Sequence, residues 1–165
     1  MIRPPVEDKK LIAAVKDLLA ASYDFSTSVP GKKVLLAVEN RDVLTAMSDQ
    51  LQKLGWETEV IGSGLHVVSQ AALFEPDLVI LDVELSEFRP QDSIRILRTF
   101  PQFKNTPVIV LTSFHISRLG VEDLYQKTVE IETLRKQCLN AGATEYIGKF
   151  NEHSFLKLIR NYIQS

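Results

Sequence analysis

The sequence predicts an α/β protein, in which helices alternate with five strands and cover both faces of one doubly wound parallel sheet. Leu78 to Leu81 are four consecutive aliphatic residues, as in a strand buried on both faces, and Asp82 follows them directly. Three other strand-like runs also end in polar residues: 33–38 before Glu39 and Asn40, 107–111 before Thr112 and Ser113, and 145–147 before Lys149. Only parallel strands bring these residues to one rim of the sheet, which is where open α/β sheets bind ligands.

An amphipathic helix is expected near the N-terminus, up to about Tyr23. Proline at its start and acidic residues in its first turn are typical of helix beginnings. Its apolar residues recur at helical spacing: Leu11, Ala14, Val15, Leu18 and Leu19. A turn-rich stretch, 26–31, then precedes the first strand. The predicted organisation is a helix and linker over residues 1–31 and one domain over residues 32–165.

The middle of the chain alternates between helix and strand signals. The predicted elements are a helix over 41–54 that Gly55 ends, a strand over 56–61, a short helix over 66–74, the central strand, and a helix over 90–100. Pro101 and Pro107 bracket the next loop. The run from Ser117 to Asn140 predicts one long helix that stops at Gly142, and a last helix follows the fifth strand.

Composition limits the possible functions. The chain has 165 residues, of which 45% are hydrophobic and 24% charged, which suits one compact domain with a real core. The net charge of −2 is spread over interspersed acids and bases, so neither a nucleic acid nor a membrane is an expected partner. A single cysteine, Cys138, excludes an internal disulfide, and no stretch has the form of a signal peptide or a membrane span. A cytoplasmic protein is therefore expected.

The segment from Ala141 to Lys149 resembles the Gly-Ala-x-x-Tyr-x-x-Lys sequence of receiver domains of two-component response regulators. The resemblance runs from about Lys32 to the C-terminus and implies the flavodoxin-like, CheY-like fold. It assigns Asp82 as the phosphoacceptor, with Thr112 and Lys149 beside it. It also makes Thr112 and Tyr146 the switch residues, which change conformation when Asp82 is phosphorylated.

The resemblance also implies a chemistry and a set of partners. An aspartate carboxylate accepts a phosphoryl group as a nucleophile and forms an acyl phosphate. The protein is then no enzyme, beyond phosphorylating itself from small donors and dephosphorylating itself. Mg²⁺ is the implied cofactor, held by Glu39, Asn40, Asp82 and the backbone carbonyl of Glu84. The implied partners are a sensor histidine kinase or phosphotransfer protein and a downstream protein.

Four departures from the family pattern are visible. Asn40 stands where the family commonly has its second acid, which predicts weaker magnesium binding. The loop after Asp82 lacks the family's Met-Pro and later Gly, and Phe150 replaces the usual proline, which predicts a trans bond after Lys149. Thr112 and Gly142 are thirty positions apart, which predicts an extended fourth helix of the receiver fold. Apolar residues in this insertion suggest partner contact or a homodimer, and an intramolecular patch without a partner explains them equally well.

Two other functional classes stay open at this point. A degenerate receiver would act as a protein-interaction or dimerisation module without phosphorylation. A haloacid-dehalogenase-like phosphohydrolase also uses an aspartate after an apolar strand, and it wants a second aspartate where Glu84 stands. Taken singly, Glu39 is equally explained as a helix cap and Lys149 as a solvated loop residue.

Overall fold

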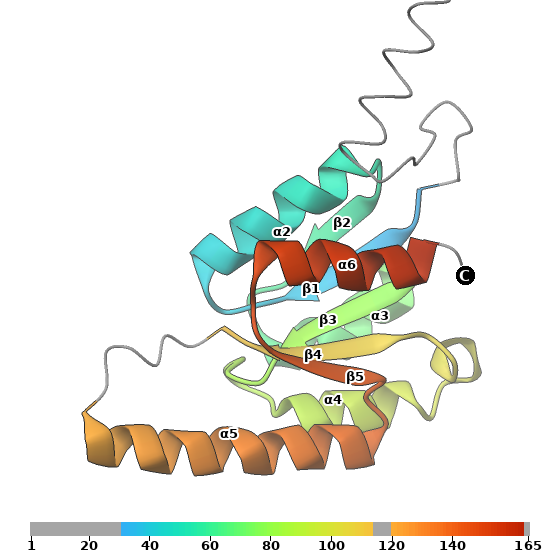
Figure 1. Cartoon of the computed structure of the whole chain (residues 1–165). Helices are drawn as coiled ribbons and strands as arrows, with labels where there is room; N and C mark the ends of the chain where they lie inside the picture. Colours follow the sequence, from blue (N-terminus) through green and yellow to red (C-terminus); the bar gives the residue numbers. More distant parts are fainter. Residues whose placement is uncertain (1–30, 114–119, 164–165) are drawn as a thin grey trace, which may run out of the picture. The chain divides into compact units, whose positions relative to one another are not determined.

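The structure, a computed structural model, describes residues 31–113 and 120–163, and all of these except Gly31 belong to a unit running from Lys32 to Ser165. Its five strands form one sheet in the order β2-β1-β3-β4-β5, and all neighbours are parallel (Figure 1). The strands are β1 (Lys33–Ala37), β2 (Glu57–Val60), β3 (Leu78–Asp82), β4 (Val108–Thr112) and β5 (Glu145–Lys149). The predicted doubly wound sheet is confirmed. The predicted N-terminal helix lies outside the described residues.

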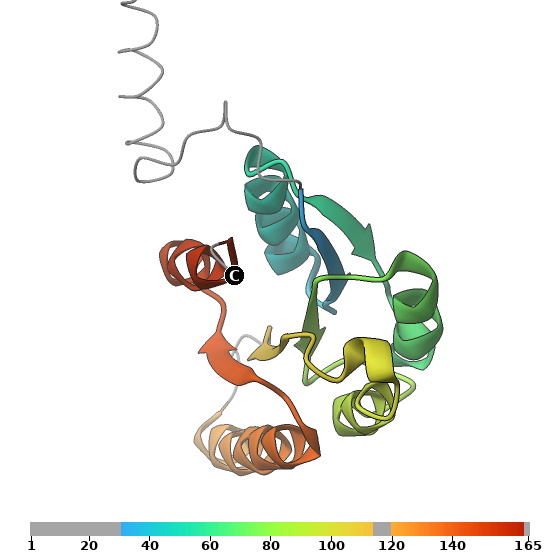
Figure 2. The same cartoon turned by 90° about the vertical axis from the view of Figure 1, so that its right-hand side faces the viewer.

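Helices cover both faces of the sheet (Figure 2). One face carries α2 (Arg41–Lys53) and α6 (Glu152–Ile163), and the other carries α3 (Val67–Phe74), α4 (Pro90–Leu97) and α5 (Val121–Ala141). Two short 3₁₀ turns, η1 (Gly64–His66) and η2 (Pro101–Phe103), complete the described elements. None of the helices in the described ranges is long and apolar enough to span a membrane.

Side-chain alternation along each strand divides the core in two. On β3, Leu78 and Ile80 pack with residues of α2 and α6, whereas Val79 and Leu81 pack with residues of α3, α4 and α5. All four side chains are at most 1% exposed. The same alternation places Asp82 on the α2–α6 face, at the carboxyl end of the strand.

Prolines explain where the predicted and observed helices differ. The helix predicted over 90–100 ends at Leu97, and Pro101 begins η2 instead. Phe100, the residue before Pro101, is extended, with φ −86° and ψ 127°, because proline disfavours a helical residue before it. The predicted lengthening of the receiver's fourth helix is confirmed, since α5 has 21 residues and stops at Gly142, where φ is 119°. Residues 117–119 of that prediction lie outside the described residues.

An irregularity in β5 positions Lys149. Val110 pairs with Tyr146 but Thr112 pairs with Lys149, so β5 spans one more residue than β4 between these pairs. Gly148 takes up the extra residue with a φ of 66°, which glycine adopts without the steric penalty of a side chain. No peptide bond of the described part is cis, so the bond from Lys149 to Phe150 is trans, as predicted.

Candidate functional site

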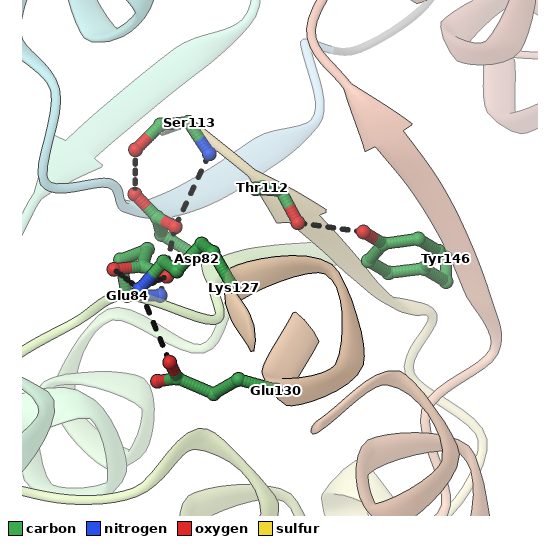
Figure 3. Close-up of polar contacts among 7 residues, drawn as sticks. All are labelled: Asp82, Glu84, Thr112, Ser113, Lys127, Glu130 and Tyr146. Atoms are coloured by element: carbon green, nitrogen blue, oxygen red, sulfur yellow. Dashed lines mark hydrogen bonds and ion pairs between the residues drawn. The ribbon is translucent and has the colours of Figure 1, made fainter. Parts of the chain in front are cut away.

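The carboxylate of Asp82 lies at the carboxyl end of β3 and is completely buried. Its Oδ1 accepts hydrogen bonds from the backbone N–H groups of Glu84, at 2.9 Å, and Ser113, at 3.4 Å. Its Oδ2 accepts one from the N–H of Glu39, at 3.0 Å. Oδ2 also accepts one from the Ser113 hydroxyl (Figure 3). Burying a carboxylate is unfavourable unless donors replace its water. These donors therefore fix both oxygens of Asp82.

Ser113 reaches Asp82 because side chains alternate along neighbouring strands. Ile109 and Leu111 of β4 belong to the core on the α2–α6 face, and Ser113 follows them in the same alternation. Asp82 lies on that same face and pairs with Leu111 across β3 and β4. Thr112 lies between Leu111 and Ser113 in the sequence, so its side chain is directed to the opposite face of the sheet.

Thr112 contacts Tyr146 and points away from Asp82 (Figure 3). The two hydroxyl oxygens lie 2.6 Å apart, and either group can donate. Burial raises the pKa of the Tyr146 phenol, and the hydrogen bond to Thr112 opposes this shift only in part. Tyr146 therefore keeps its proton at neutral pH. The two residues expected to form the switch are in direct contact.

Lys149 lies beside the site without touching Asp82. Its side chain is exposed, and it pairs with Thr112 at the carboxyl edge of the sheet. Lys149, Thr112 and Ser113 line one hollow of about 220 Å³, together with Asp42, Val43, Ala46, Phe150 and Glu152. Within the described ranges, no hydrogen bond or ion pair joins Lys149 to Asp82. The hollow thus combines one cation, Lys149, with the carboxylates of Asp42 and Glu152 and with two residues that carry hydroxyls, Thr112 and Ser113.

Two of the expected metal ligands, Asn40 and Glu39, have side chains that do not contact Asp82 in this arrangement. Asn40 Oδ1 accepts hydrogen bonds from the N–H groups of Asp42, at 2.9 Å, and Val43, at 3.1 Å, so it caps α2. The side chain of Glu39 is exposed, and only its backbone N–H meets Asp82. In the described part of the chain, no group of three or more His, Cys, Asp or Glu side chains is arranged to hold a metal. Binding of magnesium by Asn40 Oδ1 would therefore compete with the cap of α2.

Two contacts of the site were not predicted from the sequence. The first is the Ser113 hydroxyl on Asp82, which the alternation along β4 would have revealed. The second joins Glu84 to Lys127 of α5, where Nζ lies 2.8 Å from Oε1 and 3.0 Å from Oε2. Glu84 and Lys127 are 43 residues apart, and no local sequence signal predicts a contact of this kind.

Comparison with known proteins assigns this arrangement to a family. The sequence model of the response regulator receiver domain matches residues 34–160, a stretch that contains Asp82, Thr112, Tyr146 and Lys149. The chain belongs to the response regulator receiver family. This match confirms the predicted family. Receiver domains are signalling domains of two-component systems.

Known relatives agree with the receiver assignment. The receiver domain is 28% identical over 133 residues to the polar-differentiation response regulator DivK of Brucella ovis, covering 80% of this chain and 96% of DivK. The receiver domain of sensor histidine kinase PA1611 from Pseudomonas aeruginosa PAO1, with magnesium in its active site cleft, superposes with a TM-score of 0.63. The two sequences are 23% identical, and the superposition covers 82% of this chain and 99% of the PA1611 receiver domain. CheY4 of Vibrio cholerae gives a TM-score of 0.63 at 24% identity, and the superposition covers 80% of this chain and 98% of CheY4. The CheY-like fold is thereby confirmed.

Proposed function

We propose that this receiver accepts a phosphoryl group on Asp82 and signals through Thr112 and Tyr146. The supporting observation is the convergence of Asp82, Thr112 and Lys149 at the carboxyl ends of the adjacent strands β3, β4 and β5. A carboxylate at this edge can act as the nucleophile, and a cation and a hydroxyl beside it can hold phosphoryl oxygens.

In the proposed reaction an Asp82 oxygen attacks phosphorus on a histidine of a kinase or phosphotransfer protein. A P–O bond forms as the P–N bond breaks, and the electron pair leaves with the histidine nitrogen. Ser113 must first release Oδ2, because its hydroxyl donates to that atom. Thr112 must then leave Tyr146 to reach the phosphoryl group, which frees the phenol to move. The changed surface is what a downstream protein binds.

The proposed function is tested by incubating the protein with acetyl phosphate and magnesium and measuring the intact mass. One phosphoryl adduct per chain is expected, and hydroxylamine should remove it because an acyl phosphate is labile. Asp82→Asn should abolish the adduct. Asp77→Asn is the matched control, because Asp77 lies before the other end of β3 and accepts from the N–H of Lys33. An adduct that survives in Asp82→Asn would contradict the assignment.

A second candidate function is that of a degenerate receiver that binds proteins without being phosphorylated. Two observations favour it: the Ser113 hydroxyl occupies Asp82 Oδ2, and Asn40 caps α2 in place of an acid near the site. Absence of an adduct in the wild type and its appearance in Ser113→Ala would support this candidate. Steady phosphate release from a generic ester would instead indicate the phosphohydrolase class.

We further propose a cytoplasmic protein whose partners are proteins, with α5 as a contact surface. Val121, Tyr125 and Val129 of α5 are 85%, 73% and 49% exposed. Large exposed apolar side chains close together on one helix are typical of interaction surfaces, and a two-fold homodimer is the simplest assembly. Light scattering on the intact protein and on a shortened protein starting at Lys32 tests this. Monomers of unchanged stability in both would count against an interaction role.

A further inference from the structure

A partly buried ion pair joins α5 to the loop that follows Asp82. Lys127 and Glu84 are 18% and 21% exposed, and Nζ contacts both carboxylate oxygens. The ion pairs Arg89–Asp92 and Arg135–Glu132, by contrast, each join residues three positions apart and include more exposed side chains. A pair shielded from water is screened less by salt than an exposed pair, and removing one partner leaves the other charge without compensation.

Glu84 connects this ion pair to the buried carboxylate. Its backbone N–H donates to Asp82 Oδ1 at 2.9 Å, while its side chain holds Lys127 (Figure 3). The rest of the loop is held from another side, because the N–H of Gly64 donates to the carbonyl of Ser86 at 3.1 Å. Glu84 therefore contacts both α5 and the buried carboxylate of Asp82.

Lys127 lies in the first half of α5, residues 121–130, which we call its outer half and which the sequence predicts to be part of an insertion relative to the receiver pattern. The neighbouring residues Val121, Tyr125 and Val129 are exposed, and the buried residue of α5, Cys138, lies three turns further on. The contact with Glu84 is thus an attachment of this outer half to the body of the domain. Burial would lower the pKa of Lys127, but the hydrogen bond and charge of Glu84, with a smaller contribution from Glu130, raise it. The ammonium group stays charged at neutral pH.

We propose that Lys127 is a positioning residue of the Asp82 site: through Glu84 it holds the loop after β3 and links the outer half of α5 to the state of Asp82. The functional meaning of this link rests on the proposed function. A phosphoryl group on Asp82 brings new negative charge beside the Glu84 carboxylate and offers Lys127 a second anion. The ion pair must then rearrange, and the exposed residues of α5 move with it. Coupling of this kind is reciprocal, so changing Lys127 must also alter the site.

The test uses backbone amide resonances of the full chain. Asp82→Asn removes the charge at the site, and in the wild-type background it is expected to shift the resonances of Glu84 and of residues 124–129. In a Lys127→Met background the shifts at 124–129 should be lost, because the cation that connects the helix to Glu84 is absent. Lys127→Arg should restore them. Lys136→Met, an exposed lysine of the same helix, is the matched control and should leave them unchanged.

Two outcomes separate this inference from the proposed function. Equal shifts at 124–129 with methionine or lysine at position 127 would overturn the inference, whether or not an adduct forms on Asp82. Failure of acetyl phosphate to modify the wild type would overturn the proposed function alone, since the resonance test needs no phosphoryl transfer. Glu84→Gln removes the other charge of the pair, and it should reproduce the loss seen in Lys127→Met. An unchanged response in Glu84→Gln would also overturn the inference.

Discussion

The Thr112 hydroxyl and the Tyr146 phenol form a hydrogen bond of 2.6 Å on the face of the sheet opposite Asp82. Tyr146→Phe removes this bond and leaves the hydroxyl of Thr112, a residue that is 3% exposed, without that partner. A buried hydroxyl that loses its partner costs about 1–3 kcal/mol. We expect the free energy of unfolding in urea to fall by about that amount.

Tyr125→Phe provides the control for this prediction. Tyr125 is 73% exposed, so most of its side chain stays in contact with water in the folded state. It should leave the urea midpoint unchanged. If Tyr146→Phe is as stable as the wild type, the Thr112 hydroxyl finds another partner without cost, and the pair does not hold the resting state.

The architecture was predictable because it depends on local patterns. Four aliphatic residues before Asp82 indicate a buried strand, and Gly142 marks the end of α5. The extra residue in β5 was not predictable in this way, since the strand predicted over 145–147 continues to Lys149 only because Gly148 adopts a positive φ. That conformation depends on pairing with β4, which is a tertiary constraint.

The sequence predicted that Asp82, Thr112 and Lys149 lie at one edge of the sheet, but it did not predict the contacts that they make. Asn40 Oδ1 is chemically suited both to a metal and to a helix cap, and the sequence carries no information that favours one use. Ser113 contacts Asp82 and Thr112 contacts Tyr146 because consecutive residues of a strand point to opposite faces of the sheet. The ion pair of Lys127 with Glu84 depends on how α5 packs beside the loop after β3, which is distant in the sequence.

Gly64 allows the loop after Asp82 to pack closely against η1. A Cβ at this position would lie 2.4 Å from the carbonyl oxygen of Phe88, which is backbone and cannot rotate away. We expect Gly64→Ala to displace the loop and to cost about 1–3 kcal/mol, as overpacking does. Urea unfolding measures the loss.

Gly62→Ala is the matched control, because a Cβ at Gly62 meets nothing within 4 Å. It should be neutral or slightly stabilising, since alanine restricts the unfolded chain. Equal stability of the two variants would show that the loop yields without cost, and its resting position would then not be fixed by Gly64.

Cys138 predicts how stability depends on alkaline pH. Burial raises the pKa of its thiol from 9.0 to about 11. The folded state therefore holds this proton more tightly than the unfolded state, so the contribution to stability is complete below pH 9 and is lost as the pH rises toward 11. Cys138→Ala should lose less stability than the wild type between pH 8 and pH 10.5, measured by urea unfolding at both values. Parallel losses in the two proteins would contradict the raised pKa.

Asn40→Asp separates the two roles of this position. Aspartate also caps helices well, and its charge interacts favourably with the N-terminus of α2, so the cap should survive. The new carboxylate gives magnesium a charged oxygen near Asp82, and we expect calorimetric titration to show several-fold tighter binding. Asn40→Ala should instead cost about 1 kcal/mol of stability, because the N–H groups of Asp42 and Val43 lose their acceptor. Equal magnesium titrations of the wild type and Asn40→Asp would show that residue 40 serves the cap alone, and the degenerate receiver would then be the better description.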